Sequence, residues 1–520
     1  MAPRIEHSRW LVLAAAAAIV VSACSSGTTS TPQPPASVPA ASVPAASVPA
    51  ASVPAASVPA ETVPAATVPA ETVPAASEPA ITPEVTLPPL GTPVTGLNCA
   101  AGATEVKFWS SHTPPDSDSI ANIVNAFNTA NPTICVKLTL VIGSETDVAQ
   151  LVTAMHGGAA PDIYEADRFT VPERAANGVL AELPAEAVAL KDNYLEFAWN
   201  ETQFQGKTYA LPFDTDARAL FYNKDMLTAA GVDAATMKKL DDGLANNAPI
   251  TWDELAAIAA KVTKVDASGN FTQLGYYPYQ GPNGNATQAW HYTYGFSFGG
   301  SFADLAGCKV TPADPGIVKG FQWLHDYVKT LDPDKLQRFS STNYPPNYPT
   351  SQDPFLNGKV GMVITGDWSF ANMAKYVPNT KFGFTLIPVP KAGDASATWA
   401  GGWSLALIPG AAHPAEALKF MEYMTGKDGE AAYTKETTHL PTWKTLLTDT
   451  TLYDPSHAQF LSLLAGAKNR PPLPVGAEYW DALTTAQDSV VQTPQQDPLT
   501  ALQAVADKVN PDLQQFCPLQ

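Results

Sequence analysis

The sequence predicts an α/β protein with two lobes, preceded by an N-terminal segment that cannot form a core of its own. Strand-like and helix-like segments alternate from Val106 onward, which is typical of sheets with helices on both faces. The folded part of this 520-residue chain is too long for one hydrophobic core, so we expect it to divide in two. Before it, residues 25–95 contain almost nothing but Pro, Ala, Ser, Thr and Val.

The N-terminus has the pattern of a bacterial secretory signal. Arg4 and Arg9 precede an apolar run, Trp10–Val21, that is too short to span a membrane as a mature helix. The run ends in Val-Ser-Ala-Cys, which resembles the lipobox of bacterial lipoproteins. This resemblance implies a signal peptide over residues 1–23 and a lipid, with palmitate among its chains, on Cys24. Such a lipid would hold the chain at the outer face of the cell membrane; an uncleaved anchor helix is the alternative.

We expect residues 24–98 to be the lipidated cysteine followed by a disordered tether, in which the pentapeptide Ala-Ser-Val-Pro-Ala recurs in tandem. Regularly spaced proline removes backbone donors, and the small side chains cannot bury a core. Proline-rich linkers favour polyproline II at about 3.1 Å per residue, so the tether could reach roughly 200 Å. That length suits the crossing of a thick cell wall.

Composition excludes several classes of function. The net charge of −19 leaves no basic patch for phosphates, so nucleic acid is not an expected partner. The eight histidines and five cysteines lack metal-ligand spacing, and no nucleophile elbow or Walker-type loop is present, so we expect neither a metal nor a cofactor. The four cysteines after Cys24 form an even set that allows three disulfide pairings.

The folded part is expected to open with strand, helix and strand. Residues 106–109 have the pattern of a short strand, and residues 135–142 alternate as a second one. Between them, the apolar positions of residues 120–127 follow helical spacing, with Asp116 and Ser117 as capping candidates.

The same alternation continues along the chain. Residues 148–155 predict a second helix, and the Gly-Gly pair at 157–158 is expected to end it. A third strand is expected to start at Asp162. Further on, residues 251–254 carry a capping box, and residues 413–416 place a proline in the first turn of another helix.

The loops after Trp109 and after Tyr164 are the expected binding region, because ligands of open α/β sheets bind at the carboxyl ends of the strands. Aromatic rings stack on the C–H faces of sugars, Asp accepts hydrogen bonds from two hydroxyls, and Arg donates. Residues of these types are frequent at predicted strand ends or beside glycine. The candidates are Trp109, Ser110, Ser111, His112, Tyr164, Asp167, Arg168, Asp214, Asp216, Trp290, Asp367, Trp368, Trp399, Gly402, Trp403, Tyr479 and Trp480.

Four stretches in order, residues 160–169, 219–225, 250–255 and 358–368, resemble the extracellular solute-binding proteins of carbohydrate ABC importers. This is family 1, of which maltose-binding protein is the archetype, and the resemblance covers residues 104–492. It implies a two-lobed periplasmic-binding-protein fold of type II. It also implies a non-enzymatic monomer that captures a mono- or oligosaccharide between its lobes and delivers it to a membrane permease.

The resemblance also implies roles for single residues. Asp167 and Arg168 match an acid–base pair that bonds sugar hydroxyls, and Asp216 matches a sugar-binding glutamate near the first crossing between lobes. Trp368 and Trp480 match stacking tryptophans.

Three departures from the family pattern leave the identity of the sugar open. Tyr164 stands in place of a pocket tryptophan, Asp216 is one methylene shorter than glutamate, and Ser110-Ser111-His112 replaces a basic residue.

The family fold divides the chain near Asp214, Ala400 and Leu440. The first lobe is expected to comprise residues 99–215 and 401–440, and the second lobe residues 216–400 and 441–520. On that division, Cys99–Cys135 and Cys308–Cys517 are the expected disulfides, because bridges within a lobe leave the hinge free to close.

Three other functions are considered. The same fold could bind a polyol or a phosphorylated glycerol-type ligand, or the protein could bind cell-wall glycan. A glycosidase could use Asp167, Asp216 and Asp367, because two carboxylates suffice for that chemistry.

Overall fold

The computed structural model of the chain describes most of the sequence after residue 90; the described ranges are 91–143, 145–278, 290–345 and 348–519. The expected signal peptide, Cys24 and most of the expected tether lie outside these ranges, and so does the side chain of Trp290. Within the described ranges, no helix combines the length and the apolar character that crossing a membrane requires.

The first lobe is built on a six-stranded sheet. Its strands, in spatial order, are β1 (Thr92–Pro93), β3 (Ile134–Leu140), β2 (Thr104–Ser110), β4 (Ile163–Asp167), β16 (Trp403–Leu407) and β7 (Ala210–Pro212). β2 is parallel to both β3 and β4, as the alternation of strands and helices predicts. β16 lies between β4 and β7 and is antiparallel to both, so the sheet is mixed rather than wholly parallel.

Helices cover both faces of this sheet. Successive residues of a strand point to opposite faces, and β2 follows this rule. Val106 and Phe108 pack with apolar residues of α1 (Asp116–Ala130) and α13 (Pro414–Met424) on one face. Trp109 packs with residues of α2 (Ala149–His156) on the other.

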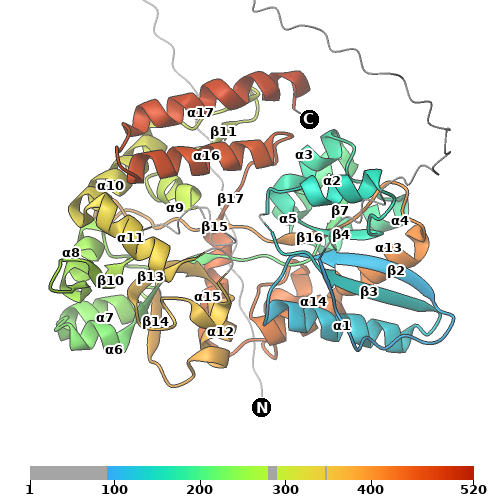
Figure 1. Cartoon of the computed structure of the whole chain (residues 1–520), viewed down its shortest axis with the longest axis horizontal. Coiled ribbons are helices and arrows are strands. Elements are labelled where there is room, and N and C mark those ends of the chain that lie inside the picture. The colour runs from blue at the N-terminus through green and yellow to red at the C-terminus, as the bar shows by residue number, and fades with distance from the viewer. Residues whose placement is uncertain (1–90, 144, 279–289, 346–347, 520) are drawn as a thin grey trace, which may run out of the picture. The chain divides into compact units, whose positions relative to one another are not determined.

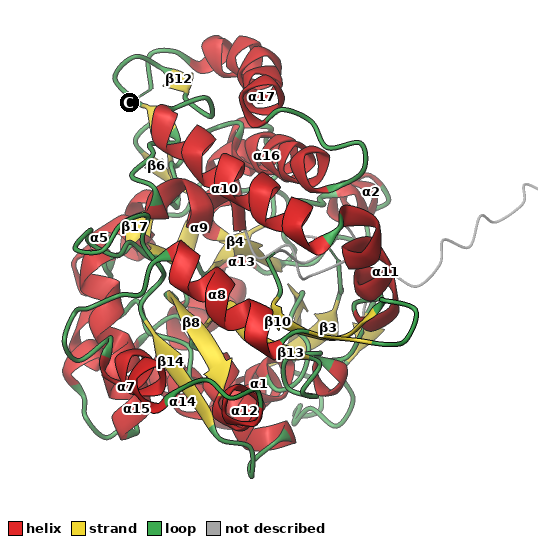
Figure 2. Cartoon of the chain, turned by 90° about the vertical axis from the view of Figure 1, so that its left-hand side faces the viewer, coloured by secondary structure: helices red, strands yellow, loops and turns green. Residues whose placement is uncertain are grey.

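The second lobe is built on a five-stranded sheet with its own core. Its strands, in spatial order, are β14 (Phe382–Thr385), β8 (Arg218–Asn223), β13 (Val360–Gly366), β10 (Phe271–Tyr276) and β9 (Lys264–Val265). Figure 2 shows α8 (Trp252–Val262) across the front of this sheet. The core extends to α10 (Pro315–Leu331), α16 (Gly476–Val491) and α17 (Pro498–Leu513). Two sheets with separate cores make the two-lobed fold.

Shorter elements complete the described part of the chain. Three two-stranded pairs are β5 (Gln203–Phe204) with β6 (Lys207–Thr208), β11 (Ala303–Asp304) with β12 (Lys309–Val310), and β15 (Trp399–Ala400) with β17 (Lys468–Asn469). The further α-helices are α3 (Val171–Ala176), α4 (Ala185–Val188), α5 (Glu196–Asn200), α6 (Lys224–Ala229), α7 (Ala234–Asp242), α9 (Trp290–Ser297), α11 (Pro333–Asn343), α12 (Ser369–Tyr376), α14 (Lys427–Thr437) and α15 (Pro455–Leu461).

Three segments run between the two sheets (Figure 1): residues 213–217 after β7, residues 401–402 before β16, and residues 438–442 after α14. Thr215 and Leu440 exchange backbone hydrogen bonds, with N···O distances of 2.7 and 3.0 Å. The first and third crossings therefore pair with each other.

The folded part begins earlier than the expected end of the tether at residue 98. β1 pairs antiparallel with β3, so Thr92 lies opposite Leu140, and the Val94 N–H donates to the Leu138 carbonyl at 2.9 Å. Gly91 precedes β1 with a φ of 105°, and a Cβ there would lie 2.6 Å from the Leu140 carbonyl oxygen. The Pro/Ala-rich composition before residue 98 has no periodicity that would predict this edge strand.

The helix starts follow the sequence signals in two places and depart from them in one. The capping box of α8 is present, with Thr251 Oγ1 accepting from the Glu254 N–H at 3.1 Å and the Glu254 carboxylate accepting from the Thr251 N–H at 2.8 Å. α13 begins at Pro414, as expected. In α1, however, neither Asp116 nor Ser117 is the cap, because the helix starts at Asp116 after Pro115. The Asp116 carboxylate faces the crossings instead.

Each lobe contains one disulfide. Cys99 is bonded to Cys135 and Cys308 to Cys517. These are the pairs that the family resemblance implied, and neither joins the two lobes.

Candidate functional site

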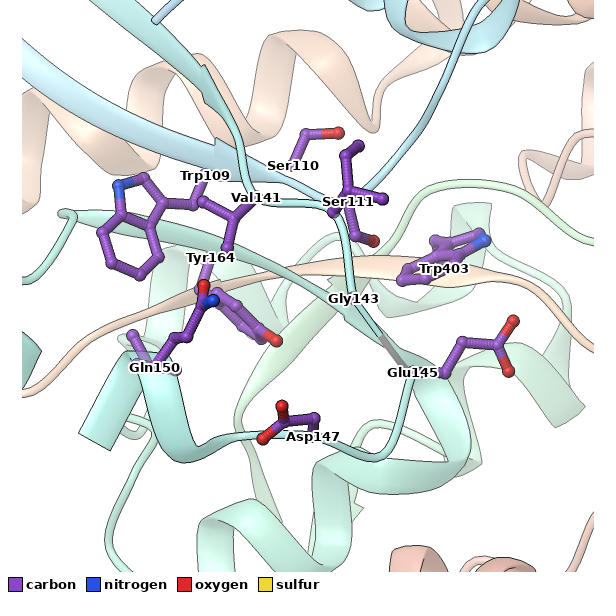
Figure 3. Close-up of a pocket in the computed structure, with 12 residues that line it drawn as sticks. Trp109, Ser110, Ser111, Val141, Gly143, Glu145, Asp147, Gln150, Tyr164 and Trp403 are labelled. Atoms are coloured by element: carbon purple, nitrogen blue, oxygen red, sulfur yellow. The ribbon is translucent and has the colours of Figure 1, made fainter. Parts of the chain in front are cut away.

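A pocket of about 70 Å³ lies beyond the carboxyl ends of β2 and β3, and Tyr164 of β4 and Trp403 of β16 also line it. The loop after Trp109, which the sequence predicts as part of the binding region, belongs to its lining. Figure 3 shows the rings of Tyr164 and Trp403 on opposite sides of this pocket, with Glu145 and Asp147 along its lower edge. Tyr164 and Trp403 are both half-buried, so part of each ring remains available to a ligand. Ser111 also lines the pocket, and its hydroxyl has no hydrogen-bond partner among the described residues.

Asp167 ends β4 and is held by a residue that the sequence analysis did not single out. Arg470 donates to both carboxylate oxygens of Asp167, at 3.0 and 2.5 Å, and both side chains are buried. Arg470 follows β17, and its guanidinium lies 4.4 Å from the centroid of the Phe169 ring. Burial alone would lower the pKa of Arg470, but Asp167 and Glu201 raise it. Asp167 therefore anchors Arg470 rather than standing free for a ligand.

Arg168 occupies a different position from the one expected of a sugar donor. Its side chain has no exposed surface. Nε donates to Glu201 at 2.9 Å, and the two terminal nitrogens donate to the backbone carbonyls of Asp214 and Gly401. Arg168 thus fastens the first lobe to the first and second crossings, and its donors are unavailable to a ligand in this arrangement.

Gly402 gives Arg168 the space for these bonds. Its φ is 121°, and a Cβ there would lie 2.4 Å from both Arg168 Nη1 and the Asp214 carbonyl oxygen. Only glycine fits so close an approach in that backbone conformation.

Asp216, at the start of the second lobe, is paired with Arg218. Asp216 also accepts from the Gly401 N–H. Burial alone would raise the pKa of Asp216, but Arg218 and that N–H outweigh it and lower the pKa. Arg218 lies over the buried ring of Trp399, with its guanidinium carbon 3.4 Å from the centroid.

Asp367 and Trp368 follow β13 at the face of the second lobe. Asp367 is fully buried and accepts from the Leu440 N–H at 2.8 Å, so it ties β13 to the third crossing. Trp368 is half-buried, with Arg218 5.3 Å from one of its rings. Two stacking tryptophans, Trp368 and Trp480, were expected in the second lobe. Trp368 is the one that keeps exposed surface.

Two buried histidines, His112 and His439, lie beside the crossings. His112 lies 4.8 Å from Trp403 between ring centroids, and its Nε2 is 3.3 Å from Glu165 Oε1. Burial alone would lower the pKa of His112, but Glu165, Asp116 and Asp214 raise it to about 9.

Burial also acts on the carboxylate of Asp214, in the first crossing. It raises the pKa of Asp214 to about 6, against the opposing charges of His439 and His112. A network of opposite charges thus surrounds the crossings.

Several expected contacts are core residues instead. Trp480 is buried and stacks on Phe169 at 4.5 Å. Trp109 contributes to the pocket lining, but its ring is buried against the first-lobe core and is directed away from Trp403 (Figure 3). Tyr479 is buried and donates to the Phe302 carbonyl at 2.8 Å. The side chain of Trp290, at the start of α9, lies outside the described residues.

Residues near the pocket that were not predicted from the sequence include Glu145, Arg218 and Arg470. Glu145 lines the pocket, and burial together with Asp167 raises its pKa to about 8, against the opposing effect of Arg470 and Arg218. The position of Glu145, five residues after the end of β3 and within the loop that follows this strand, is the signal that could have indicated it. No local signal marks Arg470, because it is 303 positions from Asp167.

Two α/β lobes joined by three crossings, with a polar pocket at the strand ends, define a two-lobed binding protein of the periplasmic type. The sequence profile of the bacterial extracellular solute-binding proteins matches residues 109–431, more than half of the chain, and the protein belongs to that family.

Known proteins agree with this assignment. A relative in Brucella abortus (strain 2308), named as a binding protein, is 26% identical over 406 residues, covering 77% of this chain and 91% of that protein. The sn-glycerol-3-phosphate-binding periplasmic protein of Escherichia coli (strain K12) is 25% identical over 407 residues, covering 72% and 83%. The structure of CpMnBP1 with mannobiose bound has the same fold, with a TM-score of 0.67, 23% identity, and coverage of 78% of this chain and 99% of that one.

Proposed function

We propose that this chain is the receptor of an ABC importer and binds an uncharged mono- or oligosaccharide between its two lobes. The observation that carries the proposal is the set of half-buried aromatic rings at the strand ends of both lobes. Tyr164 and Trp403 line the pocket of the first lobe, and Trp368 stands at the face of the second. Rings of this kind stack on sugars, and a ligand that touches both lobes favours their closed arrangement.

The polar groups at the pocket support an uncharged, hydroxyl-rich ligand. No lysine or arginine is among the described residues that line it, whereas Glu145 and Asp147 are. Of the nearby arginines, Arg168 is paired with Glu201 and Arg470 with Asp167. Arg174 lies 5.1 Å from the Tyr164 ring centroid and donates to the Glu145 carbonyl at 2.7 Å, and its Nη1 has no hydrogen-bond partner among the described residues. Phosphate recognition needs cations that are free to donate, so these carboxylates favour hydroxyl donors over anions.

A phosphorylated glycerol-type ligand is the second candidate, because one relative is a sn-glycerol-3-phosphate-binding protein. The carboxylate lining of the pocket argues against it. Catalysis as a glycosidase is not favoured either. Both oxygens of Asp167 accept from Arg470, and Asp216 forms an ion pair with Arg218. Asp367 accepts from the Leu440 N–H, so all three carboxylates have structural partners.

Thermal unfolding in the presence of candidate ligands tests the proposal. Ligands that bind the folded state raise the midpoint by mass action. Maltose and mannobiose are the sugar probes, sn-glycerol 3-phosphate is the anionic probe, and sorbitol is the polyol probe. A shift with a sugar, followed by recovery of the intact sugar after incubation, supports a receptor. A shift with the phosphate ester alone would overturn the sugar assignment, and released monosaccharide would indicate an enzyme.

The delivery of the ligand is also part of the proposal. Residues 1–23 are removed as a signal peptide, Cys24 carries a lipid, and the following tether keeps a monomeric receptor near a membrane permease. Mass spectrometry of the mature N-terminus is the direct measurement. A diacylated Cys24 supports the proposal, whereas an unmodified cysteine or an intact residue 1 contradicts the anchor.

A further inference from the structure

His439 lies in the third crossing, between two residues that are bonded to the second lobe. The Leu440 N–H donates to Asp367 Oδ2 at 2.8 Å, and the Thr438 hydroxyl donates to the Asp367 carbonyl at 2.8 Å. Asp367 directly follows β13 and directly precedes Trp368. The backbone around His439 therefore moves with the end of β13 and with the Trp368 ring.

The imidazole of His439 contacts the first lobe. Its Nε2 lies 3.6 Å from Asp116 Oδ2, in the first turn of α1, and its Nδ1 lies 3.6 Å from Asp214 Oδ2, in the first crossing. Its ring stacks on Tyr433 of α14, with centroids 5.4 Å apart and an interplanar angle of 8°. Both ion-pair distances are too long for a hydrogen bond, so the attraction depends on the charge of the ring.

His439 also faces the second lobe. Its ring centroid is 5.7 Å from that of Trp368. One buried side chain thus touches a first-lobe helix and the ring that is proposed to stack on the ligand. The residue is 6% exposed, so solvent screens these contacts little.

We propose that His439 is a positioning residue that couples the Trp368 ring to the first lobe, its charge holding Asp116 and Asp214 in the arrangement that binds ligand. The effect on ligand affinity rests on the proposed function, whereas the effect on the distance between the lobes does not.

The surroundings of His439 favour the charged ring. The charged or titratable groups that face it or its partners are Asp116, Asp214, Asp367, Tyr433, His112, His457 and Arg218. Burial alone would lower the pKa of His439, but Asp116, Asp214 and Asp367 outweigh it and raise the pKa to about 10. The ring is therefore a cation at neutral pH, and the coupling weakens only in alkaline solution.

The experiment measures the distance between the lobes in the full chain without ligand. Fluorescent labels are placed through unnatural amino acids at Ala130 and Lys264, which are exposed and lie on the first and second lobes. We expect His439→Gln to widen the distribution of distances at pH 7, and Asp116→Asn to widen it in the same way. The double variant should match the single ones, because both remove the same contact.

Affinity for whichever of maltose and mannobiose binds provides the second readout. We expect His439→Gln to weaken binding by about tenfold, a typical size for coupled neighbours. The wild-type affinity should fall between pH 8 and 10, and that fall should vanish in the variant. The matched control is His325→Gln, since His325 pairs with Asp326 in α10 of the second lobe, away from the crossings.

The outcomes separate the two proposals. If neither sugar binds but the distances still widen, the proposed function fails and the coupling holds. If a folded His439→Gln keeps the wild-type distances and pH profile, the coupling is wrong. Should that variant fail to fold, Asp116→Asn decides the question, because it retains His439; unchanged distances there would reject the proposal.

Discussion

Arg470 and Asp167 form a two-pronged ion pair that joins the segment after β17 to the end of β4, with N···O distances of 3.0 and 2.5 Å. Arg470 is 1% exposed and also lies 4.0 Å from Glu201. The pair places a second-lobe guanidinium against the end of β4, where Asp167 lies opposite Trp403 in the sheet. Asp167, which the family resemblance assigned to the ligand, thus forms an ion pair between distant parts of the chain.

Replacement of Arg470 should therefore destabilise the protein strongly. Arg470→Ala leaves Asp167 buried without its cation, whereas Glu201 keeps its ion pair with Arg168, and loss of one partner from a buried pair costs about 3–5 kcal/mol. Urea unfolding measures the loss. Lys207→Ala is the control, because it removes an exposed pair with Glu182. Equal midpoints for the two variants would contradict the assigned importance of the buried pair.

Trp368→Ala should weaken sugar binding by about 1–3 kcal/mol, through lost stacking and lost apolar burial. Titration calorimetry measures the change. Trp480→Ala is the comparison, because that ring is buried against Phe169 and its loss should lower the unfolding midpoint instead. Unchanged sugar affinity in the folded Trp368 variant would remove this ring from the site.

The Glu145 carboxylate should make sugar affinity depend on pH. Its pKa is raised to about 8, so it becomes charged as pH rises through that value. A charged carboxylate accepts stronger hydrogen bonds from sugar hydroxyls, so affinity should increase from pH 6.5 to pH 8, below the range in which His439 loses its proton. Glu145→Gln should flatten this part of the profile while the fold is retained. A profile that is identical in the variant would exclude Glu145 as the cause.

The two histidines at the crossings predict how stability varies with pH. The pKa values of His112 and His439 are raised from 6.5 to about 9 and about 10 in the folded protein. Between pH 6.5 and these values, the folded protein keeps protons that the unfolded chain has released. The free energy of unfolding should therefore fall as pH rises from 6.5 to 9.

Urea unfolding at these two pH values tests that prediction, with His112→Gln and His439→Gln expected to reduce the pH dependence. His325→Gln serves as the control, because its imidazole pairs with a mostly exposed Asp326. Stability that rises over this range would show that the two rings are neutral in the folded protein.

The fold was predictable because its signals are local. The β2–α1–β3–α2–β4 order follows from apolar spacing within short windows, and the capping box of α8 lies within four consecutive residues. The edge strand β1 was not predictable, since two residues at the end of a Pro/Ala tract carry no periodicity.

The site was predictable only in part. The strand ends indicated Tyr164, Ser111 and Trp403, which line one pocket. They could not indicate that the terminal nitrogens of Arg168 donate to backbone carbonyls or that Trp480 is buried. Both facts depend on residues far away in the sequence. Long-range pairing decides which polar residues remain free for a ligand.

The junction at β1 has a mechanical consequence. A pulling force that enters from the N-terminal side first reaches the short pairing of Thr92 and Pro93 with β3, which can peel open one bond at a time. It then meets Cys99, which is covalently joined to Cys135 at the start of the same strand. The disulfide therefore carries tension from the N-terminal side directly into β3, and the loop that it closes, residues 100–134, is shielded from extension.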